Sequence, residues 1–102
     1  MIIENIFFSM DYSPIGIIDK NPLSTDVIVD LDNGIRYMAT FFTYGAISRI
    51  ANENEISGEF LEGTYFYSNN MILIDVCSKE QVTRVIHHLI DEGEFSFVFK
   101  SL

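Results

Sequence analysis

The sequence predicts a single α+β domain spanning residues 1–102, with a mainly antiparallel sheet of about four to five strands built from hairpins and two to three helices packed on one side. Three observations predict this class. The length fits one domain with one core. A composition of 48% hydrophobic and 14% aromatic residues is too apolar for a disordered chain. Segments with two-residue alternation are interleaved with segments of helical periodicity.

The first segment is predicted to be a helix, although an apolar run this short is equally compatible with a buried strand. Its apolar residues fall on one helical face: Ile2, Ile3, Ile6, Phe7 and Met10. Between Asp11 and Thr25, Pro14, Gly16 and Pro22 then predict an irregular connection.

A β-hairpin is predicted from Asp26 to Phe42, with its turn at Asp32-Asn33-Gly34. A two-residue loop would place apolar and charged side chains on the same face. A three-residue loop with Gly34 in the left-handed conformation separates them. The resulting pairs are Leu31 with Ile35, Val29 with Tyr37, Val27 with Ala39, and Asp30 with Arg36.

Two further helices have clear start signals. Thr43 is the expected N-cap of a helix that runs to about Glu55. Ser78 and Gln81 form a capping box at the start of the second helix, and Gly93 is its expected end. The second helix carries an apolar stripe: Val82, Val85, Ile86, Leu89 and Ile90.

The remaining segments are predicted to be strands. Thr64–Tyr67 and Met71–Val76 flank Ser68-Asn69-Asn70 and predict a second hairpin. Phe95–Phe99 alternates and predicts a last short strand. Local hairpins of this kind favour antiparallel pairing throughout the sheet.

Charge and cysteine content narrow the functional classes. Fifteen acidic against six basic residues give a net charge of -9, which repels phosphate backbones, so direct nucleic-acid binding is not expected. No stretch approaches the roughly 20 apolar residues that span a bilayer, and no basic leader precedes the apolar start, so neither membrane association nor a signal peptide is expected. A single cysteine, Cys77, favours a reducing, cytoplasmic setting.

Three groups contain residue types suited to catalysis or metal binding, but none has the required pattern. His87 and His88 are neighbours on a helix, so their side chains diverge by about 100° and one ion rarely binds both. Cys77 precedes a helix start, but the histidines lie ~15 Å along that helix and cannot activate its thiol. Asp30 and Asp32 lack the spacing of a calcium loop. We therefore expect no enzyme, no catalytic residues, no metal ligands and no cofactor.

The residues best suited to binding are acidic and aromatic, and they surround a loop bracketed by Gly58 and Gly63. Carboxylates attract a basic partner, and tyrosine supplies a large contact area with a polar tip at low entropy cost. We expect six residues to bind a basic protein partner: Glu53, Glu55, Glu59, Glu62, Tyr65 and Tyr67.

Four short stretches resemble small uncharacterised bacterial proteins of the toxin-immunity kind. They are Thr40-Phe41-Phe42-Thr43, Gly58-Glu59, Gly63-Thr64-Tyr65-Phe66 and Met71-Ile72-Leu73-Ile74. The resemblance covers residues 26–99 and supplies no functional residues to carry over. It implies a protein that neutralises a toxin by binding it.

The leading expectation is therefore an immunity protein or inhibitor that covers the basic active site of a toxin, such as a nuclease, with an acidic surface. The alternative is a homodimeric adaptor or regulatory module that uses an apolar outer sheet face at Ile28, Met38 and Phe42. A small enzyme is third, and it would need a pocket that joins Cys77 or a histidine to other polar groups.

Overall fold

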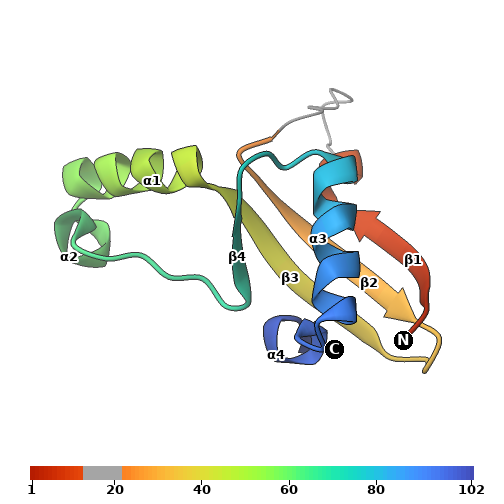
Figure 1. Cartoon of the computed structure of the whole chain (residues 1–102). Helices are drawn as coiled ribbons and strands as arrows, with labels where there is room; N and C mark the ends of the chain where they lie inside the picture. Colours follow the sequence, from red (N-terminus) through yellow and green to blue (C-terminus); the bar gives the residue numbers. More distant parts are fainter. Residues whose placement is uncertain (13–21) are drawn as a thin grey trace.

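The computed structural model describes residues 1–12 and 22–102, whose strands form one sheet in the order β1-β2-β3-β4, with β5 paired to β3 (Figure 1). The strands are β1 (Ile3–Phe8), β2 (Ser24–Leu31), β3 (Arg36–Thr43), β4 (Met71–Ile74) and β5 (Lys100–Ser101). Only the pairing of β3 with β4 is parallel among these strands. The predicted α+β class with a mainly antiparallel sheet is confirmed.

The helices differ in length and in position. They are η1 (Ser9–Tyr12), α1 (Tyr44–Ser57), α2 (Glu59–Gly63), α3 (Lys79–Asp91) and α4 (Phe95–Val98). In Figure 1, α3 crosses one face of β2 and β3, whereas α1 and α2 lie beyond the end of the sheet. Most of the irregular connection predicted between Asp11 and Thr25 lies outside the described residues. None of the described helices is long and apolar enough to cross a membrane.

The β2–β3 hairpin has the predicted register. Val29 pairs with Tyr37, and Asp30 pairs with Arg36. Gly34 has φ 78°, and its N–H donates to the Leu31 carbonyl at 3.1 Å. These contacts define the three-residue bulge loop, which only a residue tolerant of positive φ can close.

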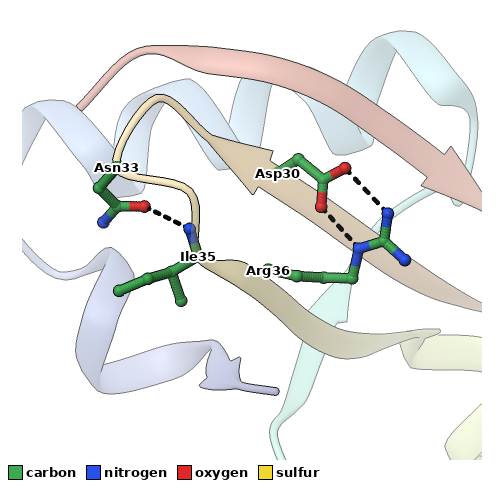
Figure 2. A network of polar contacts seen from close by, with 4 residues as sticks. All are labelled: Asp30, Asn33, Ile35 and Arg36. Carbon is green, nitrogen blue, oxygen red and sulfur yellow. Dashed lines mark hydrogen bonds and ion pairs between the residues drawn. The ribbon is translucent and has the colours of Figure 1, made fainter.

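Polar contacts fix the outer side of this hairpin (Figure 2). The Arg36 guanidinium donates to both carboxylate oxygens of Asp30, at 2.7 and 3.0 Å. These hydrogen bonds hold the pKa of Asp30 below its usual value. In the turn, the Ile35 N–H donates to Asn33 Oδ1 at 2.9 Å. The Arg36 guanidinium also lies 5.5 Å from the ring centre of Phe7. This cation–π contact links β3 to β1 on the outer face of the sheet.

The core lies between the inner face of the sheet and α3. Strand residues at alternate positions point inward, as a pleated strand requires. They are Phe8, Val27, Val29, Leu31, Tyr37, Ala39 and Phe41, all buried. From α3, Val82 and Ile86 are fully buried, with Val85, Leu89 and Ile90 packed beside them, so the predicted apolar stripe is confirmed. Each large side chain that is fully buried contributes roughly 1.5–3 kcal/mol.

Both predicted ends of α3 are confirmed. The Gln81 N–H donates to Ser78 Oγ at 3.1 Å. The Gln81 side chain does not return to Ser78 but donates to Asp75 at 3.0 Å, so only half of the capping box forms. At the other end, Gly93 has φ 72° and the Glu94 N–H donates to the Leu89 carbonyl at 2.9 Å, which is the Schellman pattern.

The prediction of an N-terminal helix was wrong, because residues Ile3–Phe8 form strand β1 on the edge of the hairpin. A register shift between Ile3 and Asn5 inserts one extra residue. Ile3 opposite Leu31 and Ile6 opposite Val29 therefore both face the core. The bulge places two inward-facing residues three positions apart, at Ile3 and Ile6. The same spacing is typical of one face of a helix, so the sequence pattern of this strand resembles that of a helix.

The second predicted hairpin was also wrong. Residues 64–70 contain no strand, and β4 pairs in parallel with β3, Phe41 opposite Ile72. A parallel neighbour requires a crossover, and α1 with α2 supplies it. Asn70, with φ 53°, ends the crossover, and its carbonyl accepts from the Thr40 N–H at 3.0 Å. The polar residues Ser68-Asn69-Asn70 thus lead from the crossover into β4 and do not form a hairpin turn.

The predicted strand at Phe95–Phe99 is mostly helix. Phe95 lies in α4 and Phe99 is its C-cap. Both are buried, and their ring centres are 4.4 Å apart. Phe97, which lies between them in the chain, is 82% exposed. Alternation placed all three phenylalanines on one face, but burying only the outer two fits a helical turn. The last strand, β5, begins one residue later at Lys100.

Candidate protein-interaction site

Residues 44–70 form an arm that stands out from the sheet, comprising α1, α2 and the segment that leads to β4 (Figure 1). The Cα radius of gyration is 14.7 Å, against about 13 Å for a compact chain of this length. The arm accounts for this elongation, because α1 continues away from β3 instead of folding back over the sheet. It contains all six residues that the sequence predicts for partner binding.

Helix α1 begins at the predicted N-cap, since the Ala46 N–H donates to Thr43 Oγ1 at 3.1 Å. Its inward side carries Ala46 and Asn54, which are buried, and Ile50, which is half-buried. Gly58 ends the helix with φ 86°, and its N–H donates to the Asn54 carbonyl at 2.9 Å. The helix therefore extends past the predicted end near Glu55 and buries only a narrow side.

Helix α2 is a left-handed turn. Phe60, Leu61 and Glu62 have φ between 51° and 57° and ψ between 40° and 53°. The Glu62 N–H donates to the Gly58 carbonyl at 3.3 Å, and the Thr64 N–H donates to the Phe60 carbonyl at 3.1 Å. For residues other than glycine, this conformation costs roughly 1–2 kcal/mol each.

Gly63 allows the backbone of this turn to pack directly against the backbone of α1. A Cβ at Gly63 would lie 2.5 Å from the Ala51 carbonyl oxygen and 3.1 Å from the Glu55 nitrogen. With φ 80°, the residue also needs the left-handed region. The close approach of the two backbones is therefore possible only with glycine at this position.

Three aromatic rings gather at this turn, and we call Phe60, Tyr65 and Tyr67 the three-ring cluster. The Tyr65 and Tyr67 rings are stacked in parallel, with centres 6.5 Å apart and planes 6° apart. The Phe60 ring is nearly perpendicular to both, with its centre 5.4 Å from that of Tyr65 and 6.2 Å from that of Tyr67. Phe66 contacts the Phe60 ring as well, with ring centres 5.2 Å apart, and it packs on Phe42, with ring centres 5.7 Å apart.

All four predicted glutamates are exposed, but they do not share one face. Glu53 and Glu55 lie on opposite flanks of α1, because two residues turn a helix by about 200°. Glu53 pairs with Arg49, with Nε and Oε1 3.1 Å apart. Glu59 and Glu62 lie on α2, on either side of Phe60 in the chain. The four carboxylates are thus spread over α1 and α2.

Several exposed apolar residues of the arm were not among the predicted binding residues. Ile56 is 89% exposed and Leu61 is 72% exposed. Phe60 was missed as well, although its position between Gly58 and Gly63 and before two tyrosines was a usable signal. Tyr44, at the start of α1, is exposed but lies outside the three-ring cluster.

The other candidate groups lie outside the arm. Cys77 is fully buried, and burial raises the pKa of its thiol to about 11. His87 and His88 are exposed on α3, where both line an open hollow of about 670 Å³ with Lys79, Glu80, Arg84 and Asp91. Asp30 is engaged by Arg36. Within residues 1–12 and 22–102, no three His, Cys, Asp or Glu side chains are grouped so that they could hold a metal ion.

The outer face of the sheet is only partly apolar. Ile28 and Met38 pair across β2 and β3, are half-buried, and line a shallow groove of about 410 Å³ with Phe7 and Asp26. Phe42, which the sequence placed with them, is buried under Phe66 of the arm. The comparisons with known proteins give no match, since no family model matches the chain and no curated protein or solved structure is significantly similar to it.

Proposed function

We propose that this chain is a non-enzymatic binding protein that neutralises a basic partner by covering its cationic surface with the arm, as an immunity protein does with a toxin such as a nuclease. One observation carries the proposal. The arm stands clear of the sheet (Figure 1) and carries both exposed aromatic rings and four exposed glutamates. We place this activity in the cytoplasm, where a lone buried thiol such as Cys77 stays reduced.

Charge supports a basic partner. Between Tyr44 and Asn70 the chain has four glutamates and one basic residue, Arg49, which is already paired with Glu53. An active site built for phosphates displays lysine and arginine, so its potential is complementary to that of the arm. Complementary potentials accelerate encounter and disfavour wrong partners.

Exposed apolar area supports a protein partner rather than a small ion. Ile56, Leu61, Tyr65 and Tyr67 are each at least half exposed. Tyr65 and Tyr67 are exposed side by side, and tyrosine is enriched among the residues that dominate binding energy. In this proposal the aromatic rings anchor the partner and the carboxylates select and orient it.

The test is capture of a basic protein by the immobilised natural chain, followed by an assay for loss of that protein's activity. The arm variant carries Glu53→Gln, Glu55→Gln, Glu59→Gln and Glu62→Gln. We expect the natural protein to capture and inhibit a basic protein at about 50 mM salt, and to release it as salt screens the charges. The arm variant should capture at least tenfold less.

A matched control separates local charge from net charge. Glu80→Gln, Asp91→Asn, Glu92→Gln and Glu94→Gln remove the same number of carboxylates from exposed positions on and just after α3. This control should capture as much as the natural protein. Equal losses in the two variants would show that only net charge matters, and the arm would then have no special role.

A homodimeric adaptor is the second candidate, and the outer sheet groove at Phe7, Ile28 and Met38 favours it. An apolar dimer interface holds at high salt, whereas electrostatic capture does not. Light scattering at low and high salt gives the molar mass directly. A dimer that persists at high salt and is lost in Ile28→Ser with Met38→Ser would favour the adaptor.

A further inference from the structure

The three-ring cluster has the form of a cation site. Two parallel rings and a third nearly perpendicular to both lie together, and no two ring centres are more than 6.5 Å apart. One cation can therefore lie within about 6 Å of all three centres, which is the range of cation–π attraction. Tyr65 is 50% exposed and Tyr67 is 63% exposed, so a side chain from outside can reach the rings.

The backbone is strained where it presents the third ring. Phe60 begins the run of three left-handed residues in α2. Such strain persists where the surrounding structure over-determines it, and it concentrates at ligand clamps. Here Gly63 holds the turn against α1, and the packing of Phe66 on Phe42 holds the tyrosine segment to the sheet. The result is a fixed position for Phe60 beside both tyrosines.

No cation of this chain fills the cluster among the described residues. The cation–π contacts there are Arg36 with Phe7 and Lys79 with Phe8, both remote from the arm in sequence and on other elements. Arg49 donates instead to Glu53. Glu59 and Glu62, both exposed, flank Phe60 in the chain and add negative potential around the rings.

We infer that the three-ring cluster binds the guanidinium group of an arginine side chain of the basic partner. Arginine fits better than lysine because its flat, weakly hydrated group stacks on aromatic faces. This inference rests on the proposed function for the source of the arginine. The ring geometry can nevertheless be tested without any partner.

The experiment is an NMR titration with N-acetyl-arginine methylamide, with the citrulline analogue as its uncharged control of the same shape. The arginine compound should shift the ring protons of Phe60, Tyr65 and Tyr67 in a saturable way, with a dissociation constant on the order of 10 mM. The citrulline compound should leave these protons unshifted. Equal shifts with both compounds would overturn the inference.

Substitutions identify the rings as the site. Tyr65→Leu with Tyr67→Leu should weaken binding of the arginine compound at least tenfold, whereas Tyr65→Phe with Tyr67→Phe should retain it, because only the rings are needed. Tyr44→Leu removes an exposed tyrosine of the same arm outside the cluster and should bind as the natural protein does. Amide spectra confirm that each variant is folded. Undiminished binding by the folded double leucine variant would overturn the inference.

The inference and the proposed function can fail separately. If a basic protein is captured through the glutamates and the double leucine variant captures it equally, the proposed function stands and the cluster has no role in binding arginine. If the cluster binds the arginine compound selectively but no basic protein is captured, the cation site stands and the proposed function is overturned.

Discussion

At the scale of single residues, Asn54 is the least explained side chain of the arm. It is 6% exposed, and its Nδ2 has no hydrogen-bond partner among the described residues. Leaving a buried donor unpaired costs about 1–3 kcal/mol, whereas an apolar group of the same shape avoids that cost. Natural chains retain such a cost where selection acts on something other than stability.

Replacing Asn54 should therefore stabilise the protein. We expect Asn54→Leu to raise the free energy of unfolding by about 1 kcal/mol, measured by urea denaturation. Asn52→Leu, on the exposed side of the same helix, is the control and reports only the change in helix propensity. A gain no larger for Asn54→Leu than for Asn52→Leu would mean that the buried amide is satisfied in solution.

Cys77 should be chemically inert in the folded protein. Burial raises its pKa from 9.0 to about 11, which lowers the thiolate fraction about a hundredfold at neutral pH. Alkylation at pH 8 should accordingly be at least a hundredfold slower than in denatured protein. Rapid labelling of the native protein would contradict the buried position.

The raised pKa of Cys77 also determines how the free energy of unfolding changes with pH. The folded state holds the Cys77 proton more tightly than the unfolded state does, because its folded pKa is the higher of the two. As pH rises, the thiol therefore ionises at a lower pH in the unfolded state, and this ionisation stabilises the unfolded state relative to the folded state. This contribution to stability is complete below pH 9 and declines as pH rises toward 11.

At the scale of elements, the arm depends on the contact between α1 and α2. Gly63→Ala places a Cβ 2.5 Å from the Ala51 carbonyl oxygen at a positive φ. We expect a loss of more than about 2 kcal/mol in the free energy of unfolding. Gly45→Ala is the matched control, since a Cβ there meets open space within α1 and should stabilise by roughly 0.5–1 kcal/mol. A Gly63→Ala variant as stable as the natural protein would contradict the left-handed turn and its close approach to α1.

Elements with local signals could be predicted from the sequence, and those that depend on remote partners could not. The β2–β3 register followed from Gly34 and from the separation of charged and apolar faces. The α3 caps followed from Ser78 and Gly93. In contrast, the bulge near Glu4 depends on how β1 pairs with β2, and the parallel position of β4 depends on its pairing with β3. Local periodicity does not reveal which strands pair.

The candidate site was predictable in composition but not in geometry. The glutamates and tyrosines were identified by type and by their crowding around Gly58 and Gly63. Their placement on a protruding arm depends on the parallel crossover, and the position of Phe60 depends on left-handed residues that no propensity favours.

At the scale of the whole molecule, the chain combines a compact sheet and helix layer with an acidic, elongated extension. The layer holds the buried core, whereas the arm contributes only Ala46 and Asn54 as buried helix residues. Such a division suits a binding protein, because a rigid scaffold presents a surface that is costly to leave exposed. We therefore expect this arm, rather than the outer sheet face, to meet the partner.

The most direct test is an NMR map of backbone amides in the natural protein, with and without the captured basic partner. We expect the largest changes to fall within residues 44–70, centred on Phe60, Tyr65 and Tyr67, and to weaken as salt is raised. Changes centred on Phe7, Ile28 and Met38 that persist at high salt would contradict it and place the interface on the outer face of the sheet.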